Sequence, residues 1–243
     1  MGEDFRASSR RAFVYPPYAG GFILLLFMLL LIITFLIPML IMFAFHELGI
    51  PFWLTLFILW ASLIGSLINI PLKEIRTGRY VERMGIVSFY GIPYYVPRIE
   101  EEKLIIAINV GGGIIPLLVS AYVFGTYLMG GDMALIAKGL INIGIVTLIT
   151  YKFSKIVEGV GIAVPAFIPP LISTIVALSI AWESPYGVAY VGGTLGTLIG
   201  ADLLNLPKIT KLKAPVVSIG GAGTFDGIFL SGIIALILVL IIH

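Results

Sequence analysis

Two aspartates, Asp202 and Asp226, lie inside long apolar segments of this 243-residue chain. The other acidic residues fall in tails, in loops or at the outer end of an apolar segment. A carboxylate in the middle of a membrane span costs about 2.5–3.5 kcal/mol on insertion scales, so it normally serves a function and faces protein or water. Asp202 and Asp226 belong to consecutive predicted helices joined by a short loop, which predicts that they are neighbours.

Two carboxylates that face each other cannot both ionise cheaply, so one keeps a proton while the other loses it. Such a pair supplies a general acid and a general base that share one water molecule. This arrangement hydrolyses a peptide bond without a metal, a cofactor or a covalent intermediate. We therefore expect Asp202 and Asp226 to be a catalytic pair, with no metal site and no cofactor.

The residues before Asp226 favour close approach of a substrate backbone. Gly220, Gly221 and Gly223 remove side-chain bulk, and together with Thr224 they are the predicted substrate-binding residues. The preceding segment 215–219 is β-prone, so it is suited to pairing with an extended peptide.

The depths of the two aspartates set a condition on the chain between them. Asp202 lies six residues before Lys208, which corresponds to about 9 Å of helix. Asp226 lies 13 residues after Lys213, which corresponds to about 19 Å if every residue is helical. The two carboxylates can therefore meet only if segment 214–222 is partly non-helical.

The composition excludes an ordinary water-soluble domain. The chain is 59% hydrophobic and 12% charged, with a mean hydropathy of +1.10, whereas soluble proteins carry roughly 25% charged residues. Cysteine is absent, which excludes disulfides, thiolate zinc sites and a cysteine nucleophile. The net charge of +2 and the lack of a Lys/Arg-rich stretch argue against a nucleic-acid partner.

Seven segments are long and apolar enough to cross a bilayer, since a spanning helix needs about 20 mainly apolar residues. We therefore predict an all-α, multi-pass protein of the cell membrane, built as one transmembrane domain over residues 1–243 and surrounded by membrane lipid. The predicted spans are 20–46, 51–71, 105–129, 133–151, 160–182, 186–206 and 215–242.

Basic residues predict the orientation of these spans, because Lys and Arg in short loops stay on the cytoplasmic side. All of the 15 Lys and Arg residues except Lys138 fall before the first span or in alternate loops. This segregation places the N-terminus inside and the C-terminus outside. The longest of the basic loops, 72–104, combines β-prone residues with Gly and Pro turn residues, and it predicts a small β-rich cytoplasmic hairpin.

The two halves of the chain resemble each other in sequence. Segment 66–71 (SLINIP) is echoed by 202–207 (DLLNLP), and the glycines at 111–113 are echoed by those at 220–223. Three helices, a linking helix and three more helices would form a parallel 3+1+3 repeat. Asp202 stands where the first half has Ser66, and Asp226 has only apolar counterparts there, so the acidic residues inside spans are confined to the second half.

The segments around the two aspartates resemble intramembrane aspartyl proteases of the GxGD type, such as presenilin and signal peptide peptidase. The run Gly221-Ala222-Gly223-Thr224-Phe225-Asp226 is similar to an expanded form of the Gly-x-Gly-Asp motif, and 226–236 is similar in character to the segment after that motif in signal peptide peptidases. The resemblance implies that Asp202 and Asp226 are the catalytic pair, reached from the cytoplasmic side. A prokaryotic membrane family that shares only the Asp pair is the alternative.

Three functions fit these observations. The first is a protease-like hydrolase that cleaves membrane-spanning peptides near the cytoplasmic face. The second is a secondary transporter or channel that uses Asp202 and Asp226 for proton or sodium coupling, and the third is a scaffold without chemistry. In a purely structural interpretation, Asp202 caps the end of its helix together with Asn205, and Asp226 bonds to a neighbouring helix.

Overall fold

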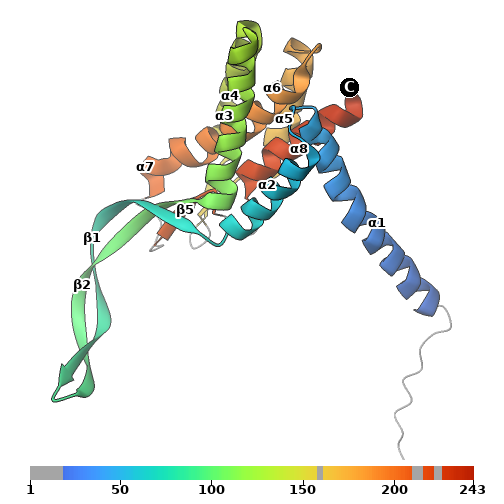
Figure 1. Ribbon diagram of the computed structural model, residues 1–243. Coiled ribbons are helices and arrows are strands. Elements are labelled where there is room, and N and C mark those ends of the chain that lie inside the picture. The colour runs from blue at the N-terminus through green and yellow to red at the C-terminus, as the bar shows by residue number, and fades with distance from the viewer. Residues whose placement is uncertain (1–18, 158–160, 210–215, 222–225) are drawn as a thin grey trace, which may run out of the picture. The chain divides into compact units, whose positions relative to one another are not determined.

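The computed structural model describes residues 19–157, 161–209, 216–221 and 226–243 (Figure 1). Two of the predicted substrate-binding residues, Gly223 and Thr224, lie outside these described residues. The contacts of the chain divide it into two compact units, with the boundary between Leu40 and Ile41. The single transmembrane domain over residues 1–243 stays a prediction.

The described residues are mostly helical. The α-helices are α1 (Ala19–His46), α2 (Phe52–Gly65), α3 (Ile115–Gly130), α4 (Met133–Phe153), α5 (Ile168–Ile180), α6 (Pro185–Thr197), α7 (Leu206–Ile209) and α8 (Gly227–Ile242). Two π-helical segments interrupt this pattern, at Val110–Ile114 before α3 and at Leu198–Asp202 after α6, and a 3-10 turn follows at Leu203–Asn205.

Five strands accompany the helices in the described part of the chain, so the prediction of an all-α fold is wrong. Strands β1 (Asn69–Phe89) and β2 (Ile92–Asn109) form the predicted hairpin, and it is longer than the expected 72–104. Strand β5 (Val216–Ile219) pairs in parallel with residues Ile105–Ile108 of β2, which gives the order β1-β2-β5. Strands β3 (Lys155–Val157) and β4 (Gly161–Ala163) form a second, two-stranded sheet.

Four helical segments among the described residues are long and apolar enough to cross a membrane: Gly20–His46, Val110–Gly130, Met133–Phe153 and Pro185–Lys208. Three shorter apolar helices, α2, α5 and α8, lie within the other predicted spans and cover part of each. The chain is therefore a mostly helical protein with the features of a membrane protein.

The structure shortens several predicted helices because strands take over their ends. The segment predicted as helix over 51–71 is helical only to Gly65, and β1 begins at Asn69. The segment predicted over 105–129 begins as strand β2, and the last helix begins at Gly227 rather than at 215. Apolar β-branched residues serve a buried strand as well as a membrane helix, so hydropathy alone did not separate the two.

Within the Ile41–His243 unit, α6 is the central helix and packs against α3, α4, α5 and α8. Most of its residues are buried, including Tyr190, whose ring packs edge-on against Phe45 with 5.8 Å between the ring centroids. Glycines allow this packing: a Cβ at Gly193 would lie 2.7 Å from the carbonyl oxygen of Ser231 in α8. The close fit places the end of α6 beside the start of α8.

A buried amide ties α6 to two of its neighbours. The Asn142 side chain on α4 donates from Nδ2 to the carbonyl oxygen of Ser173 on α5 at 3.1 Å and to that of Val188 on α6 at 2.9 Å. Asn142 is fully buried, so these bonds compensate for the loss of hydration of its N–H groups. The side chain of Asn142 therefore packs between three helices.

Gly193→Ala should destabilise the protein by about 1–3 kcal/mol, because the added methyl group overpacks the α6–α8 contact. The measurement is the thermal unfolding midpoint of the purified protein in detergent. Gly144→Ala on α4 is the matched control, since a Cβ there meets nothing within 4 Å. Equal midpoints for both variants would show that the α6–α8 contact does not depend on glycine.

Candidate functional site

Asp202 is the last residue of the π-helical segment that follows α6, and its side chain is half-buried. It does not cap the end of its own helix, which is the task of Asn205. The Asn205 side chain donates from Nδ2 to the carbonyl oxygens of Gly200 and Ala201 at 3.3 and 2.8 Å, and Lys208 Nζ donates to its Oδ1. The carboxylate of Asp202 therefore faces other parts of the chain.

Asp226 is the N-cap of α8 and is only 7% exposed. Its Oδ1 accepts a hydrogen bond from the backbone N–H of Ile228 at 2.8 Å, so one oxygen stabilises the first turn of the helix. This bond is structural, but it lies at the start of Asp226's own helix, α8, whereas the structural interpretation expected a bond to a neighbouring helix. A carboxylate has two oxygens, and a helix N-terminus favours the negative charge that both of them share.

Gly220 connects the two aspartates. Strand β5 ends at Ile219, and Gly220 follows in the left-handed conformation at φ 72°, where glycine is favoured. Its backbone N–H donates to Oδ2 of Asp202 at 3.2 Å. The extended β5 meets the condition that segment 214–222 is partly non-helical.

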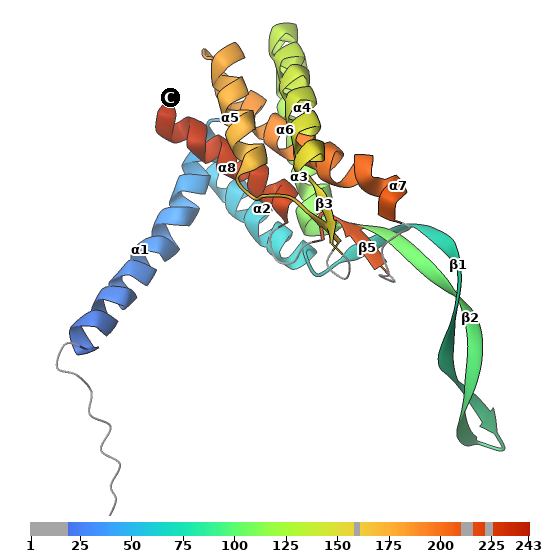
Figure 2. The same ribbon diagram turned by 180° about the vertical axis from the view of Figure 1, so that it is seen from behind.

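Gly112, from the first half of the chain, lies against both Gly220 and Asp226. It lies in the π-helical segment before α3, and a Cβ built on it would overlap the carbonyl oxygen of Gly220 and the Cβ of Asp226. A Cβ on Gly220 would in turn overlap the backbone of Gly112 and Gly113. Two backbones therefore meet directly at the site. Strand β5, which leads into Gly220, lies beside the base of β2 (Figure 2).

Asn109 fixes the position of Gly112. Its Oδ1 accepts from the Gly112 N–H at 2.9 Å, and its Nδ2 donates to the carbonyl oxygen of Ser66 at 2.8 Å and to Oδ1 of Asn69 at 3.0 Å. Ser218 of β5 donates to the same Asn69 oxygen at 2.5 Å. A buried side chain from the end of β2 thus joins the ends of α2, β1 and β5 around the aspartates.

Sequence reasoning found Asp202, Asp226 and Gly220, and missed Asn109 and Gly112. The glycine run 111–113 was visible as part of the repeat, but the sequence does not say what it packs against. Gly221 lies at the site's edge, exposed and in contact with Ser218. The described residues contain no cluster of three or more His, Cys, Asp or Glu that would bind a metal ion.

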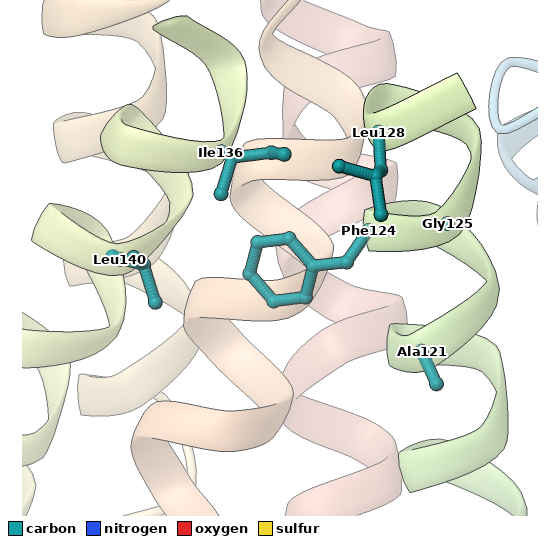
Figure 3. Close-up of a pocket in the computed structure, with 6 residues that line it drawn as sticks. All are labelled: Ala121, Phe124, Gly125, Leu128, Ile136 and Leu140. Atoms are coloured by element: carbon teal, nitrogen blue, oxygen red, sulfur yellow. The ribbon is translucent and has the colours of Figure 1, made fainter. Parts of the chain in front are cut away.

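An apolar pocket of about 450 Å³ lies elsewhere, between α3 and α4 (Figure 3). Its lining has no ionisable group, so it suits a hydrocarbon chain rather than acid–base chemistry. The lining residues are Ala121, Phe124, Gly125, Leu128, Ile136 and Leu140. The site at Asp202 and Asp226 is therefore the better candidate for a reaction.

Comparison with known proteins places the chain in one family. The model of the family described as "Protein of unknown function (DUF1614)" matches residues 63–238, and the chain belongs to this family. The matched region contains Asn109, Gly112, Asp202, Gly220 and Asp226. Neither the curated proteins nor the solved structures contain a match to the chain.

Gly112→Ala should disrupt the site, because the methyl group must displace either Gly220 or Asp226. We expect a loss of about 1–3 kcal/mol in unfolding free energy, typical of overpacking. Thermal unfolding in detergent measures it. The control is Gly125→Ala on α3, where a Cβ meets nothing within 4 Å. An unchanged midpoint for Gly112→Ala would show that the two backbones do not meet.

Proposed function

We propose that this protein is an intramembrane aspartyl protease-like hydrolase of the GxGD type, with Asp202 and Asp226 as its catalytic pair. The observation that carries the proposal is the link through Gly220 and Gly112. Gly220 donates to Asp202, and Gly112 contacts both Gly220 and Asp226. These contacts through two glycines support one shared site for the carboxylates of two separate helical segments. A catalytic dyad requires such a site.

The proposed reaction is hydrolysis of a peptide bond by one water molecule. The ionised carboxylate takes a proton from the water as its oxygen attacks the substrate carbonyl carbon, and the protonated carboxyl group supports the carbonyl oxygen. Collapse of the tetrahedral intermediate breaks the C–N bond, and the departing nitrogen takes a proton from the dyad. Each turnover consumes one water molecule. The pair gains one proton from the water and gives one to the departing nitrogen, so it again holds one proton at the end.

Strand β5 supports a place for an extended substrate. It is the edge strand of the sheet order β1-β2-β5, so its second edge has no strand partner among the described residues. The strand leads directly into Gly220, and a peptide paired to its edge would run toward Asp202 and Asp226. The substrate class is a membrane-spanning peptide that unwinds locally, with Gly220, Gly221, Gly223 and Thr224 as the proposed contact residues.

We also propose seven membrane crossings, with the N-terminus in the cytoplasm and the protein in the cell membrane. The four long and three shorter apolar helices support this number. The segregation of basic residues supports the orientation. In this topology the hairpin and β5 lie on the cytoplasmic side, so substrates are cleaved near that face. The repeat stays a prediction that is in keeping with β2 and β5, which run parallel and each lead through glycine into a helix.

Asp202→Asn and Asp226→Asn should each abolish cleavage of a reporter transmembrane peptide by the protein reconstituted in vesicles. Asparagine keeps the size of the side chain and is itself a good N-cap residue, so α8 keeps its cap in the second variant. The amide of asparagine cannot act as a general acid or a general base, so the acid–base function is lost. Cleavage is measured by separating the products and determining their masses.

The control for both variants is Asp132→Asn, at the exposed start of α4. It should cleave at the rate of the unchanged protein. Thermal unfolding of all three variants tests whether the fold is intact. Normal cleavage by a folded Asp202→Asn or Asp226→Asn variant would refute the proposal.

Proton- or sodium-coupled transport is a second candidate, favoured by the interrupted helices. The segments beside the aspartates are π-helical, and broken helices near charged groups are typical of transporter sites. In the described part of the chain, α4 also carries two buried oxygens without a hydrogen-bond partner, Asn142 Oδ1 and Thr150 Oγ1. Both side chains lie against glycines of the central segment, Gly192 and Gly200.

A transport function predicts proton or sodium flux into vesicles that contain the protein, measured with a trapped pH- or sodium-sensitive dye. Asp202→Asn should remove the flux, and Asp132→Asn should leave it unchanged. Flux that is equal in all variants, or absent from the unchanged protein under an imposed gradient, would exclude this candidate. Peptide cleavage needs no gradient, so the two functions are distinguishable.

A further inference from the structure

No other described part of the chain covers the outer part of the β1–β2 hairpin. Within the described residues, the segment between Arg76 and Lys103 contributes no side chain to any hydrophobic cluster, whereas Ile75 and Leu104 on either side of it do. Only the base of the hairpin has a third strand, β5. An isolated two-stranded hairpin is at best marginally stable in water, so an uncovered hairpin of this length implies a partner.

The exposed side chains of this part are apolar on both faces. Opposed residues such as Ile86 and Tyr95 share one face, and their neighbours point to the other. Met84, Ile86 and Tyr95 lie on the first face, with 71, 63 and 70% exposure. The second face carries Ile92, Tyr94 and Val96, with 56, 51 and 40% exposure. A docked protein covers one face of a hairpin, whereas a bilayer surrounds both.

The charges divide the hairpin into two zones. The stem carries both signs, and Lys103 Nζ lies 2.7 Å from Glu74 Oε1, which lowers the pKa of that carboxyl group. Residues 84–99, which we call the tip, contain no acidic residue and one basic residue, Arg98. The side chain of Arg98 extends over Gly85, and a Cβ at Gly85 would lie 3.0 Å from Arg98 Cδ. Tyrosine beside arginine is typical of segments in the headgroup region.

The pairing also provides a bend between the stem and the helices. The register of β1 and β2 shifts between Pro71 and Lys73 and again between Arg76 and Tyr80. Gly78, inside the second irregularity, has φ 67°. Bulges of this kind bend and twist a strand pair, so the hairpin is not a straight extension of the sheet at its base.

We infer that the tip of the hairpin, residues 84–99, inserts into the interfacial region of the bilayer, with Arg98 on the phosphate groups of anionic lipids. The occupant of the two exposed faces is thus the membrane in which the protein already resides. This inference rests on the hairpin and does not depend on the hydrolase.

The absence of cysteine allows a direct test in the full-length protein. Tyr95→Cys in the tip and Arg76→Cys in the stem, both exposed in the structure, are each labelled with one fluorescent dye. The protein is reconstituted in vesicles of phosphatidylcholine with phosphatidylglycerol. The dye is then quenched by aqueous iodide or by lipids that carry a nitroxide near the headgroup.

Lipid nitroxide should quench the dye at position 95 and iodide should not, with the reverse at position 76. Arg98→Glu should lower the ratio of inserted to free tip about fivefold in anionic vesicles, the equivalent of about 1 kcal/mol per basic residue at an anionic surface. The same substitution should have a smaller effect in vesicles of phosphatidylcholine alone.

Two results would overturn the inference. Equal iodide quenching at positions 95 and 76 would show that the tip lies in water. The dye at position 95 could instead be protected from both quenchers. If that protection disappears when the protein is diluted in lipid, a second copy of the chain covers the tip. Thermal unfolding of each labelled variant shows whether the fold is kept.

Discussion

Direct contact between the backbones of Gly112 and Gly220 determines how the two carboxylates are arranged. Gly220 carries the N–H that reaches Asp202, and Gly112 lies between Gly220 and Asp226. Any side chain at either glycine would separate the segments, because there is no space for a Cβ. In a membrane, where helices gain little from hydrophobic association with one another, packing through small residues is a main source of close contact.

Several unrelated parts of the chain serve this contact. Asn109 sets the start of the α3 segment, and β5 pairs with β2 so that Gly220 arrives beside Gly112. Glycines along α6 allow α8 to approach, which brings the N-cap residue Asp226 to the end of α6. Asp226 therefore combines a structural role with the proposed chemical one, since one oxygen caps the helix and the carboxylate as a whole remains part of the pair.

The hairpin shows how the same polypeptide meets two environments. Its base is joined to β5 and to the residues around the aspartates, whereas its tip exposes tyrosine, isoleucine and methionine on both faces. Proteins usually shield exposed strand edges with charge or with other elements. Here the tip contains one charged residue, Arg98, and the other charged residues lie in the stem. This distribution suits a segment with its stem in water and its tip among lipids.

The sequence by itself determined the class of protein, the two aspartates and the need for a non-helical segment before Asp226, because hydropathy and buried charge are local properties. It also predicted the hairpin, from β-prone residues between turn residues. It did not determine that strands replace helix ends at 69–71 and 105–109, since apolar β-branched residues suit both structures. Only the tertiary structure decided that Asn109 and Gly112 belong to the site. Neither the hydrogen bond of Asn109 to Ser66 nor the backbone contact of Gly112 with Gly220 leaves a periodic signal in the chain.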